Sequence, residues 1–271
     1  MKSKRKILWP VVMLLILGSW AGNIWYYLSM QLAEPLFLHH NITIGGDWGE
    51  RIELTFLENN NADYKVTGLQ IEQLPQLRFE FYESRKHIHH TEMKAYAELR
   101  ADEVQQHSKE PITINEVTVY YNQGQPKKVP IGEIHVVWNS EEGLVDFISG
   151  SSSSSGEGSY VVNLTKQATL EKVDFTFSEK LKPWFELNLS GEPVDSLDYP
   201  IELVQGDRLA FTYQWSIPDN EPAALEVYQS KIMLHFLTED GRTVIEYVPI
   251  NHNLNLSDHQ LKRLVRSGGY F

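Results

Sequence analysis

The sequence predicts a mainly β protein: an N-terminal transmembrane helix followed by two tandem antiparallel β-sandwich domains of the Ig-like type. Three observations predict it. The chain begins with an uncharged apolar stretch, short segments with a period of two follow, and a serine- and glycine-rich segment divides them into two groups. We therefore expect a cytoplasmic stub at 1–6, a membrane segment at 7–32, sandwiches at 33–148 and 160–271, and a linker at 149–159.

The N-terminal segment has the length and the flanking charges of a membrane anchor. Residues 7–28 carry no charged side chain, and this length is close to the roughly 20 residues that a helix needs to cross the hydrocarbon layer. The basic residues that precede it are Lys2, Lys4, Arg5 and Lys6. Lys and Arg next to a span stay on the cytoplasmic side. We therefore expect a single-pass protein of the cell membrane whose bulk is extracytoplasmic.

A cleaved signal peptide is the alternative interpretation of this segment. Ser19 and Ala21 have the spacing of small residues before a cleavage site. However, the apolar run continues through residues 24–28, so that cleavage would leave an exposed apolar N-terminus. This favours an uncleaved anchor.

Charge and cysteine content exclude several classes of protein. All 36 acidic residues follow the anchor, and the 20 basic residues outside the stub leave that part with a formal charge of −16. Such a surface disfavours nucleic acid as a partner. The chain has no cysteine, so an exported domain must be held by its apolar core alone. Extracellular sandwiches of animals often carry a disulfide, and its absence is more typical of a bacterial cell envelope.

The first predicted sandwich rests on alternating segments separated by turns. Apolar residues occupy every second position at Ile52, Leu54 and Phe56; at Leu77, Phe79 and Phe81; at Val117, Val119 and Tyr121; and at Ile134, Val136 and Trp138. Asparagine at 59–61 and glycine and proline within 123–126 predict reversals. Residues 90–106 contain good helix formers, but their alternation favours a strand.

The second predicted sandwich follows the linker. Its alternating positions are Tyr160, Val162 and Leu164; Val173, Phe175 and Phe177; Phe185, Leu187 and Leu189; Leu209, Phe211, Tyr213 and Trp215; and Ile232, Leu234 and Phe236. Glycine-containing hairpin turns are expected at 205–207 and 239–241. Ser257 and Gly268 have the identities of a helix N-cap and stop, so they predict a short helix that covers a sheet edge. The serine segment would instead be a loop if both halves formed one continuous sandwich.

Histidines form the one cluster of metal-ligand types in the sequence. The candidate ligands are His87, His89 and His90, with His39 and His40 upstream. On a strand, His87 and His89 would share a face, as a zinc or copper site requires. The alternative is a polar loop, because the neighbouring Arg85 and Lys86 would repel a divalent ion.

An exposed indole is the second candidate for ligand contact. Trp48 follows Asp47 and two glycines, so it is expected on a turn where it would stack on a sugar or contact a cation. The alternative is a hairpin whose Trp48 packs back onto the sheet.

No catalytic signature and no cofactor motif is present in the sequence. We therefore expect a non-catalytic, membrane-anchored interaction or scaffold module that contacts another envelope protein or a surface polymer. The alternative is a sensor or a solute- or metal-binding ectodomain, and a cell-surface hydrolase is less favoured. A solute site requires a concave pocket with convergent polar groups, whereas a protein partner requires a flat apolar patch or an open sheet edge.

Overall fold

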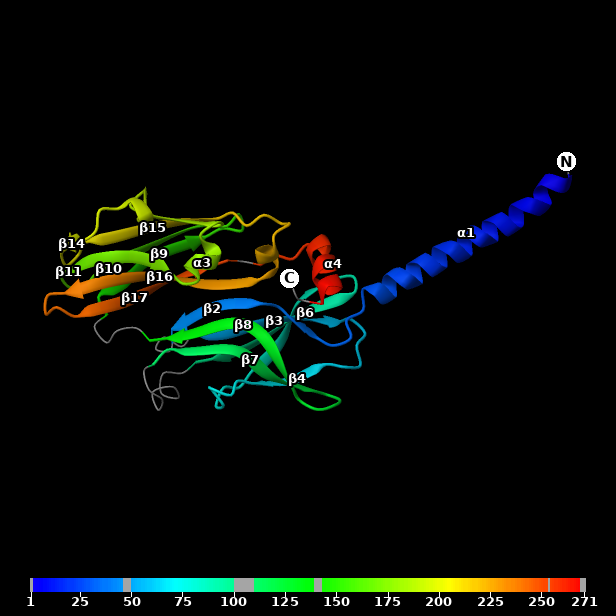
Figure 1. Ribbon diagram of the computed structural model, residues 1–271, viewed down its shortest axis with the longest axis horizontal. Coiled ribbons are helices and arrows are strands. Elements are labelled where there is room, and N and C mark those ends of the chain that lie inside the picture. Colours follow the sequence, from blue (N-terminus) through cyan, green and yellow to red (C-terminus); the bar gives the residue numbers. More distant parts are fainter. Residues whose placement is uncertain (1, 46–49, 100–109, 139–142, 253, 269–271) are drawn as a thin grey trace.

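The computed structural model describes residues 2–45, 50–99, 110–138, 143–252 and 254–268 (Figure 1). Helix α1, Lys2–Ser29, projects away from a β-rich body. Its segment Trp9–Ser29 is long and apolar enough to cross a membrane. The helix ends at Ser29 rather than at residue 32, because the chain then turns into the body.

The rest of the chain is mainly β, as predicted. In the first half the strands are β1 (Leu36–Phe37), β2 (His40–Gly45), β3 (Arg51–Asn59), β4 (Val66–Gln70), β5 (Glu80–Lys86), β6 (His90–Glu98), β7 (Ile112–Tyr121) and β8 (Lys127–Val137). In the second half they are β9 (Val145–Ser152), β10 (Glu157–Leu164), β11 (Ala168–Phe175), β12 (Phe185–Leu189), β13 (Glu192–Pro193), β14 (Ile201–Leu203), β15 (Arg208–Trp215), β16 (Val227–Thr238) and β17 (Thr243–Asn251). The short helices are α3 (Ser178–Leu181), η1 (Val194–Ser196), η2 (Pro222–Leu225) and α4 (Asp258–Ser267).

The strands form three sheets, one of which is shared by both halves. The shared sheet has the order β14-β11-β16-β2-β8-β7-β4, with β17 also paired to β16. The other two have the orders β1-β3-β6-β5 and β13-β12-β15-β10-β9. Strand β2 pairs in parallel with both β8 and β16, so the expectation of purely antiparallel sheets is wrong at this strand. The two halves are therefore joined through backbone hydrogen bonds.

Each smaller sheet covers one part of the shared sheet through its own apolar core. Ile42 of β2 belongs to the core of the first half, and Tyr228 of β16 belongs to the core of the second. Tyr228 pairs with Asn41, whose side chain points away from Ile42, because successive strand residues face opposite sides. The two cores therefore lie on opposite faces of the shared sheet.

The serine-rich segment differs from the expected linker at 149–159. Residues 145–152 and 157–164 form the paired strands β9 and β10, with only a tight turn between them. A Cβ at Gly158 would lie 2.1 Å from the ring of Tyr213, and one at Gly150 would lie 3.0 Å from the ring of Tyr160. The glycines at 150 and 158 therefore leave space for aromatic rings and do not mark a flexible connector.

Several other sequence expectations are confirmed, but the expected hairpin at 205–207 is wrong. The alternating residues of β3, β15 and β16 are buried. Of the segment expected as a strand at 90–106, residues 90–98 form strand β6, and residues 100–106 lie outside the described residues. The 239–241 turn joins the hairpin β16–β17, whereas the 205–207 turn joins β14 to β15, which do not pair with each other. Ser257 and Gln260 form a capping box at the start of α4, which ends at Gly268 with φ of 65°.

Candidate functional site

The three predicted metal ligands lie together at the β5–β6 turn, but they make different contacts. His90 Nε2 donates a hydrogen bond to the carbonyl oxygen of Met30 at 2.7 Å, and burial lowers the pKa of His90. The His89 ring lies edge-on to Tyr26, with the centroids 5.6 Å apart. His87 Nε2 lies 3.9 Å from a carboxylate oxygen of Glu92. Among the described residues no three His, Cys, Asp or Glu side chains form a metal-binding group, so metal binding here stays a prediction without geometric support.

His40 is a structural residue that joins three strands. Its Nδ1 donates to the carbonyl oxygen of Ile131 at 3.0 Å, and its Nε2 accepts from the backbone N–H of Thr55 at 2.8 Å. Burial lowers its pKa to about 4, although the bond to Ile131 opposes this shift. The backbones of His40 and Gly132 approach so closely that a Cβ at Gly132 would lie 2.2 Å from the carbonyl oxygen of His40. The side chain is thus committed to the fold and is not free to hold a metal.

The end of α1 is fixed to the body by polar and aromatic contacts. Asn59 accepts from the backbone N–H of Leu32 at 2.9 Å and donates to its carbonyl oxygen at 2.8 Å. Lys262 of α4 places its ammonium 4.6 Å from the ring centre of Tyr26. His89 also contacts the ring of Tyr27, with the centroids 5.8 Å apart. The histidine turn therefore forms part of a joint between the apolar helix and the β-rich body.

A second polar cluster lies where the two halves meet. Asn41 Nδ2 donates to Glu226 at 2.6 Å and Asn41 Oδ1 accepts from Lys180 of α3 at 2.8 Å. Glu226 also accepts from the hydroxyl of Tyr228 at 2.8 Å. These groups satisfy one another, so the cluster stabilises the junction and presents no unpaired group for chemistry.

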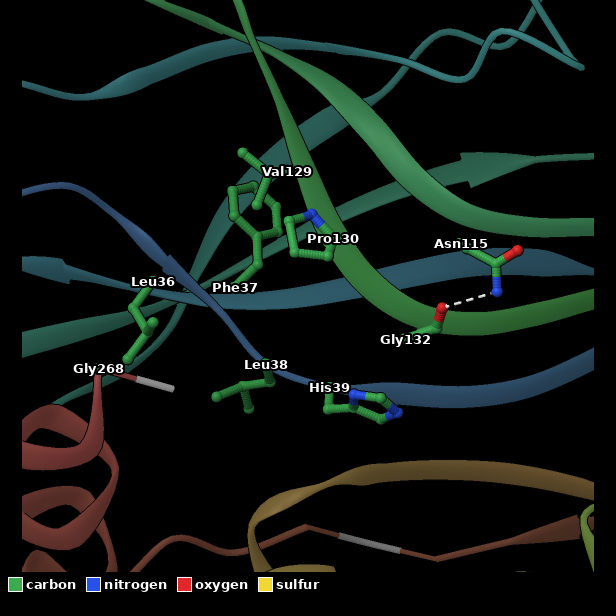
Figure 2. A pocket seen from close by; sticks show the side chains of 9 residues that line it. All are labelled: Leu36, Phe37, Leu38, His39, Asn115, Val129, Pro130, Gly132 and Gly268. Carbon is green, nitrogen blue, oxygen red and sulfur yellow. Dashed lines mark hydrogen bonds between the residues drawn. The ribbon is translucent and has the colours of Figure 1, made fainter. Parts of the chain in front are cut away.

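An open pocket of about 380 Å³ lies beside β1 and β8 (Figure 2). Its lining consists of Leu36, Phe37, Leu38, His39, Asn115, Val129, Pro130, Gly132 and Gly268. Figure 2 shows Phe37 close to Val129 and Pro130, while Asn115 donates to the carbonyl oxygen of Gly132 at 3.3 Å. Among the described residues that line this pocket, only His39 has an ionisable side chain. The volume suits a small molecule, but few polar groups converge on it.

The outer edge of β9 is an exposed strand edge. This strand ends its sheet, and in the described part of the chain no strand pairs with its outer side. Phe147 and Ile148 have exposed fractions of 60% and 44%. Asp146 is the only charged residue of the strand. Natural edge strands are usually protected by lysine, proline or a covering loop, and β9 contains neither residue.

The sequence alone does not indicate this edge. A period-two pattern indicates which residues of a strand share a face, but not which strand ends the sheet. Phe147 and Ile148 directly precede the serine run. Two large apolar residues beside a polar segment were the one sign in the sequence that this strand could expose apolar side chains. The other ligand-contact candidates, Trp48 and Asp47, lie outside the described residues.

Comparison with known proteins does not identify a family. No protein-family model and no curated protein matches the chain. The YadV chaperone matches with 8% identity, 80% of this chain and 100% of that chain covered, and a TM-score of 0.26. A Porphyromonas gingivalis W83 protein of unknown function matches with 8% identity, 81% and 97% covered, and a TM-score of 0.26. A chimeric titin Z1Z2 matches with 12% identity, 81% and 97% covered, and a TM-score of 0.25. Scores of this size do not establish a shared fold.

Proposed function

We propose that this chain is a non-catalytic, single-pass membrane protein that contacts another envelope protein through the outer edge of β9. In this proposal α1 spans the cell membrane with its basic end in the cytoplasm, and two Ig-like sandwiches joined by the shared sheet lie outside. The observation that carries the proposal is the open edge of β9 with its exposed Phe147 and Ile148.

An edge of this kind binds an extended segment by adding a strand to the sheet. Main-chain hydrogen bonds supply affinity, and apolar side chains next to the edge supply specificity. Phe147 is fixed against Tyr160, with ring centroids 4.9 Å apart, so part of the contact surface is ordered before a partner arrives. The near absence of charge on β9 matches an uncharged or apolar segment. A surface polymer that lacks backbone amides would gain little from this edge.

In-cell photo-crosslinking of the full-length protein tests the proposal. A photoreactive residue at Phe147 is expected to give a discrete protein adduct, and Ile148→Lys in the same chain should abolish it because a charge on an edge opposes strand addition. The same residue at Tyr82, which is exposed on the edge strand β5, is the matched control. Equal adducts from both positions, or an adduct insensitive to Ile148→Lys, would overturn the proposal.

The orientation in the membrane has its own test. Protease added to intact cells should digest the body and leave α1 protected. Digestion only after the cells are permeabilised would place the body in the cytoplasm and remove this part of the proposal.

A solute sensor is the second candidate, and the pocket beside β1 favours it. Val129→Trp would fill that pocket from β8. Thermal unfolding of the full chain in detergent, with sugars, metal ions or peptides added, discriminates the two functions. A large shift with one small molecule that Val129→Trp abolishes would replace the β9 interaction as the leading function.

A further inference from the structure

The tip of the β5–β6 turn exposes an isoleucine next to the apolar helix. Ile88 has an exposed fraction of 75%. Its turn is well fixed, since Asn60 Nδ2 donates to the carbonyl oxygens of His87 at 2.9 Å and Ile88 at 3.0 Å. His87 N–H also donates to the carbonyl oxygen of His90 at 2.8 Å. An apolar β-branched side chain is thus held outward by an ordered turn, and the fold itself makes no use of it.

The position of this tip along α1 follows from its aromatic contacts. Tyr26 and Tyr27 lie in the last turn of α1, and tyrosine rings at the end of a span favour the headgroup layer. The His89 ring contacts both tyrosine rings, at centroid distances of 5.6 and 5.8 Å. Ile88 precedes His89 directly, so its Cα lies about 3.8 Å from that of His89. When α1 spans a bilayer, Ile88 is therefore brought to the level of the headgroups.

Basic side chains that could contact phospholipid headgroups lie beside the tip. Lys86 is exposed on the same turn, and Lys262 stands over the ring of Tyr26. Arg85, also exposed, is hydrogen-bonded to Asn255. Acids lie near the tip as well: Asp258 and Glu92 each lie 3.9 Å from a ring nitrogen of His87, and Glu83 is exposed on β5. Basic groups thus lie at this end of an otherwise acidic protein, and each one near an anionic membrane adds attraction.

We propose that the β5–β6 turn inserts Ile88 into the headgroup layer of the bilayer that holds α1, and that Lys86 and Lys262 contact its anionic headgroups. This inference rests on the proposed membrane anchor. It gives the body a second point of contact with the membrane, in addition to the joint at the end of α1, so that two contacts set the orientation of the body relative to the bilayer. The β9 edge would then keep a constant orientation relative to the membrane.

The absence of cysteine from the chain makes a labelling experiment direct. Three full-length variants are made, each with a single cysteine: Ile88→Cys, Leu17→Cys and Val204→Cys. Each cysteine is labelled with an environment-sensitive fluorophore. The labelled proteins are reconstituted into vesicles of phosphatidylcholine and phosphatidylglycerol with and without a nitroxide-bearing lipid. Leu17 lies within α1 and reports the anchor itself. Val204 is 56% exposed and follows β14, at the end of the body opposite α1 in Figure 1, so it is the matched control.

We expect the lipid nitroxide to quench the labels at positions 17 and 88 strongly and the label at position 204 hardly at all. In the same proteins, a blue-shifted emission should accompany quenching at position 88. Quenching at 17 without quenching at 88 would overturn membrane contact by the turn and leave the anchor intact. No quenching at 17 would overturn the anchor and this inference together. Equal quenching at 88 and 204 would also overturn it, because the contact would then not be specific to the turn.

Discussion

Lys231 of β16 donates a hydrogen bond to Glu50 at 2.5 Å and thereby connects the two halves beside the shared sheet. The Lys231 side chain is only 2% exposed and that of Glu50 is 18% exposed. The second carboxylate oxygen of Glu50 accepts from the backbone N–H of Gly45 at 2.8 Å. Burial lowers the pKa of Lys231, and the Glu50 carboxylate opposes that shift. The ammonium is thus held in the interior by a partner from the other half of the chain.

Removing Glu50 should destabilise the protein strongly. Glu50→Ala removes a carboxylate that accepts a hydrogen bond from the buried ammonium of Lys231, and breaking a buried pair in this way costs about 3–5 kcal/mol. The neighbouring Arg51→Ala is the matched control, because its ion pair with Glu98 is exposed and such pairs are worth about 0.2–1 kcal/mol. Urea unfolding of both full-length variants in detergent measures the difference. Equal losses would mean that the buried pair is not important for joining the halves.

Acidification should destabilise the fold through His40. The folded-state pKa of His40 is about 4, below its ordinary value of 6.5, because burial disfavours the imidazolium. The unfolded chain therefore binds a proton at a pH where the folded chain does not. Stability is fully present above pH 6.5 and is lost as the pH falls toward 4, by about 3 kcal/mol for this one group.

The contribution of His40 can be isolated by comparing how steeply the free energy of unfolding of each variant changes with pH. His40→Gln should be less stable than the parent at pH 7, because Gln cannot reproduce both hydrogen bonds. Its free energy of unfolding should also depend less on pH between 6.5 and 4. His259→Gln, at an exposed position of α4, should keep the parental slope. Parallel slopes for the parent and His40→Gln would contradict this assignment.

The sequence predicted individual strands better than their assembly. Alternation at Ile52, Leu54 and Phe56 indicated a buried strand face, because a period of two is visible within a few neighbouring residues. The parallel pairing of β2 left no such signal, since it joins residues far apart in the chain. The capped helix α4 was predictable because its Ser257 and Gly268 signals are local.

The candidate site was less predictable than the fold. The three histidines lie at one turn, but their contacts are with Met30, Tyr26 and Glu92, and sequence spacing does not indicate those contacts. The exposure of Ile88 and Phe147 is likewise a property of the assembled sheets. Sequence composition was misleading at the serine-rich segment. Its glycines at 150 and 158 are required because aromatic rings pack against the backbone there, and composition does not show such packing.

Adding a methyl group at Gly158 should destabilise the second half. The new Cβ of Gly158→Ala would lie 2.1 Å from the buried ring of Tyr213, and overpacking of this kind costs about 1–3 kcal/mol. Ser154→Ala in the adjacent turn is exposed and should change the stability little. Thermal unfolding of the two full-length variants makes the comparison. Tolerance of both substitutions would restore the linker interpretation of this segment.

The core of the second half begins before the serine-rich segment. Leu144 is 1% exposed and belongs to the core of the second half, and its N–H donates to the buried Glu246 at 2.9 Å. A fragment of residues 160–271 lacks this residue and strand β9, so it leaves β10 without one of its neighbours and opens the core. A fragment of residues 143–271 keeps both.

We therefore expect fragment 143–271 to unfold in urea with a cooperative transition. Fragment 160–271 should aggregate, or unfold at a lower urea concentration and without cooperativity, because its strand edge is unpaired. Ile148→Lys in the longer fragment should leave its transition unchanged, since that side chain lies on the exposed edge. Fragment 143–271 still lacks β2, which pairs with β16, so it should be less stable than the full chain. If both fragments unfolded with the same cooperative transition, β9 would be dispensable and the boundary would lie within the serine-rich segment, as composition alone predicts.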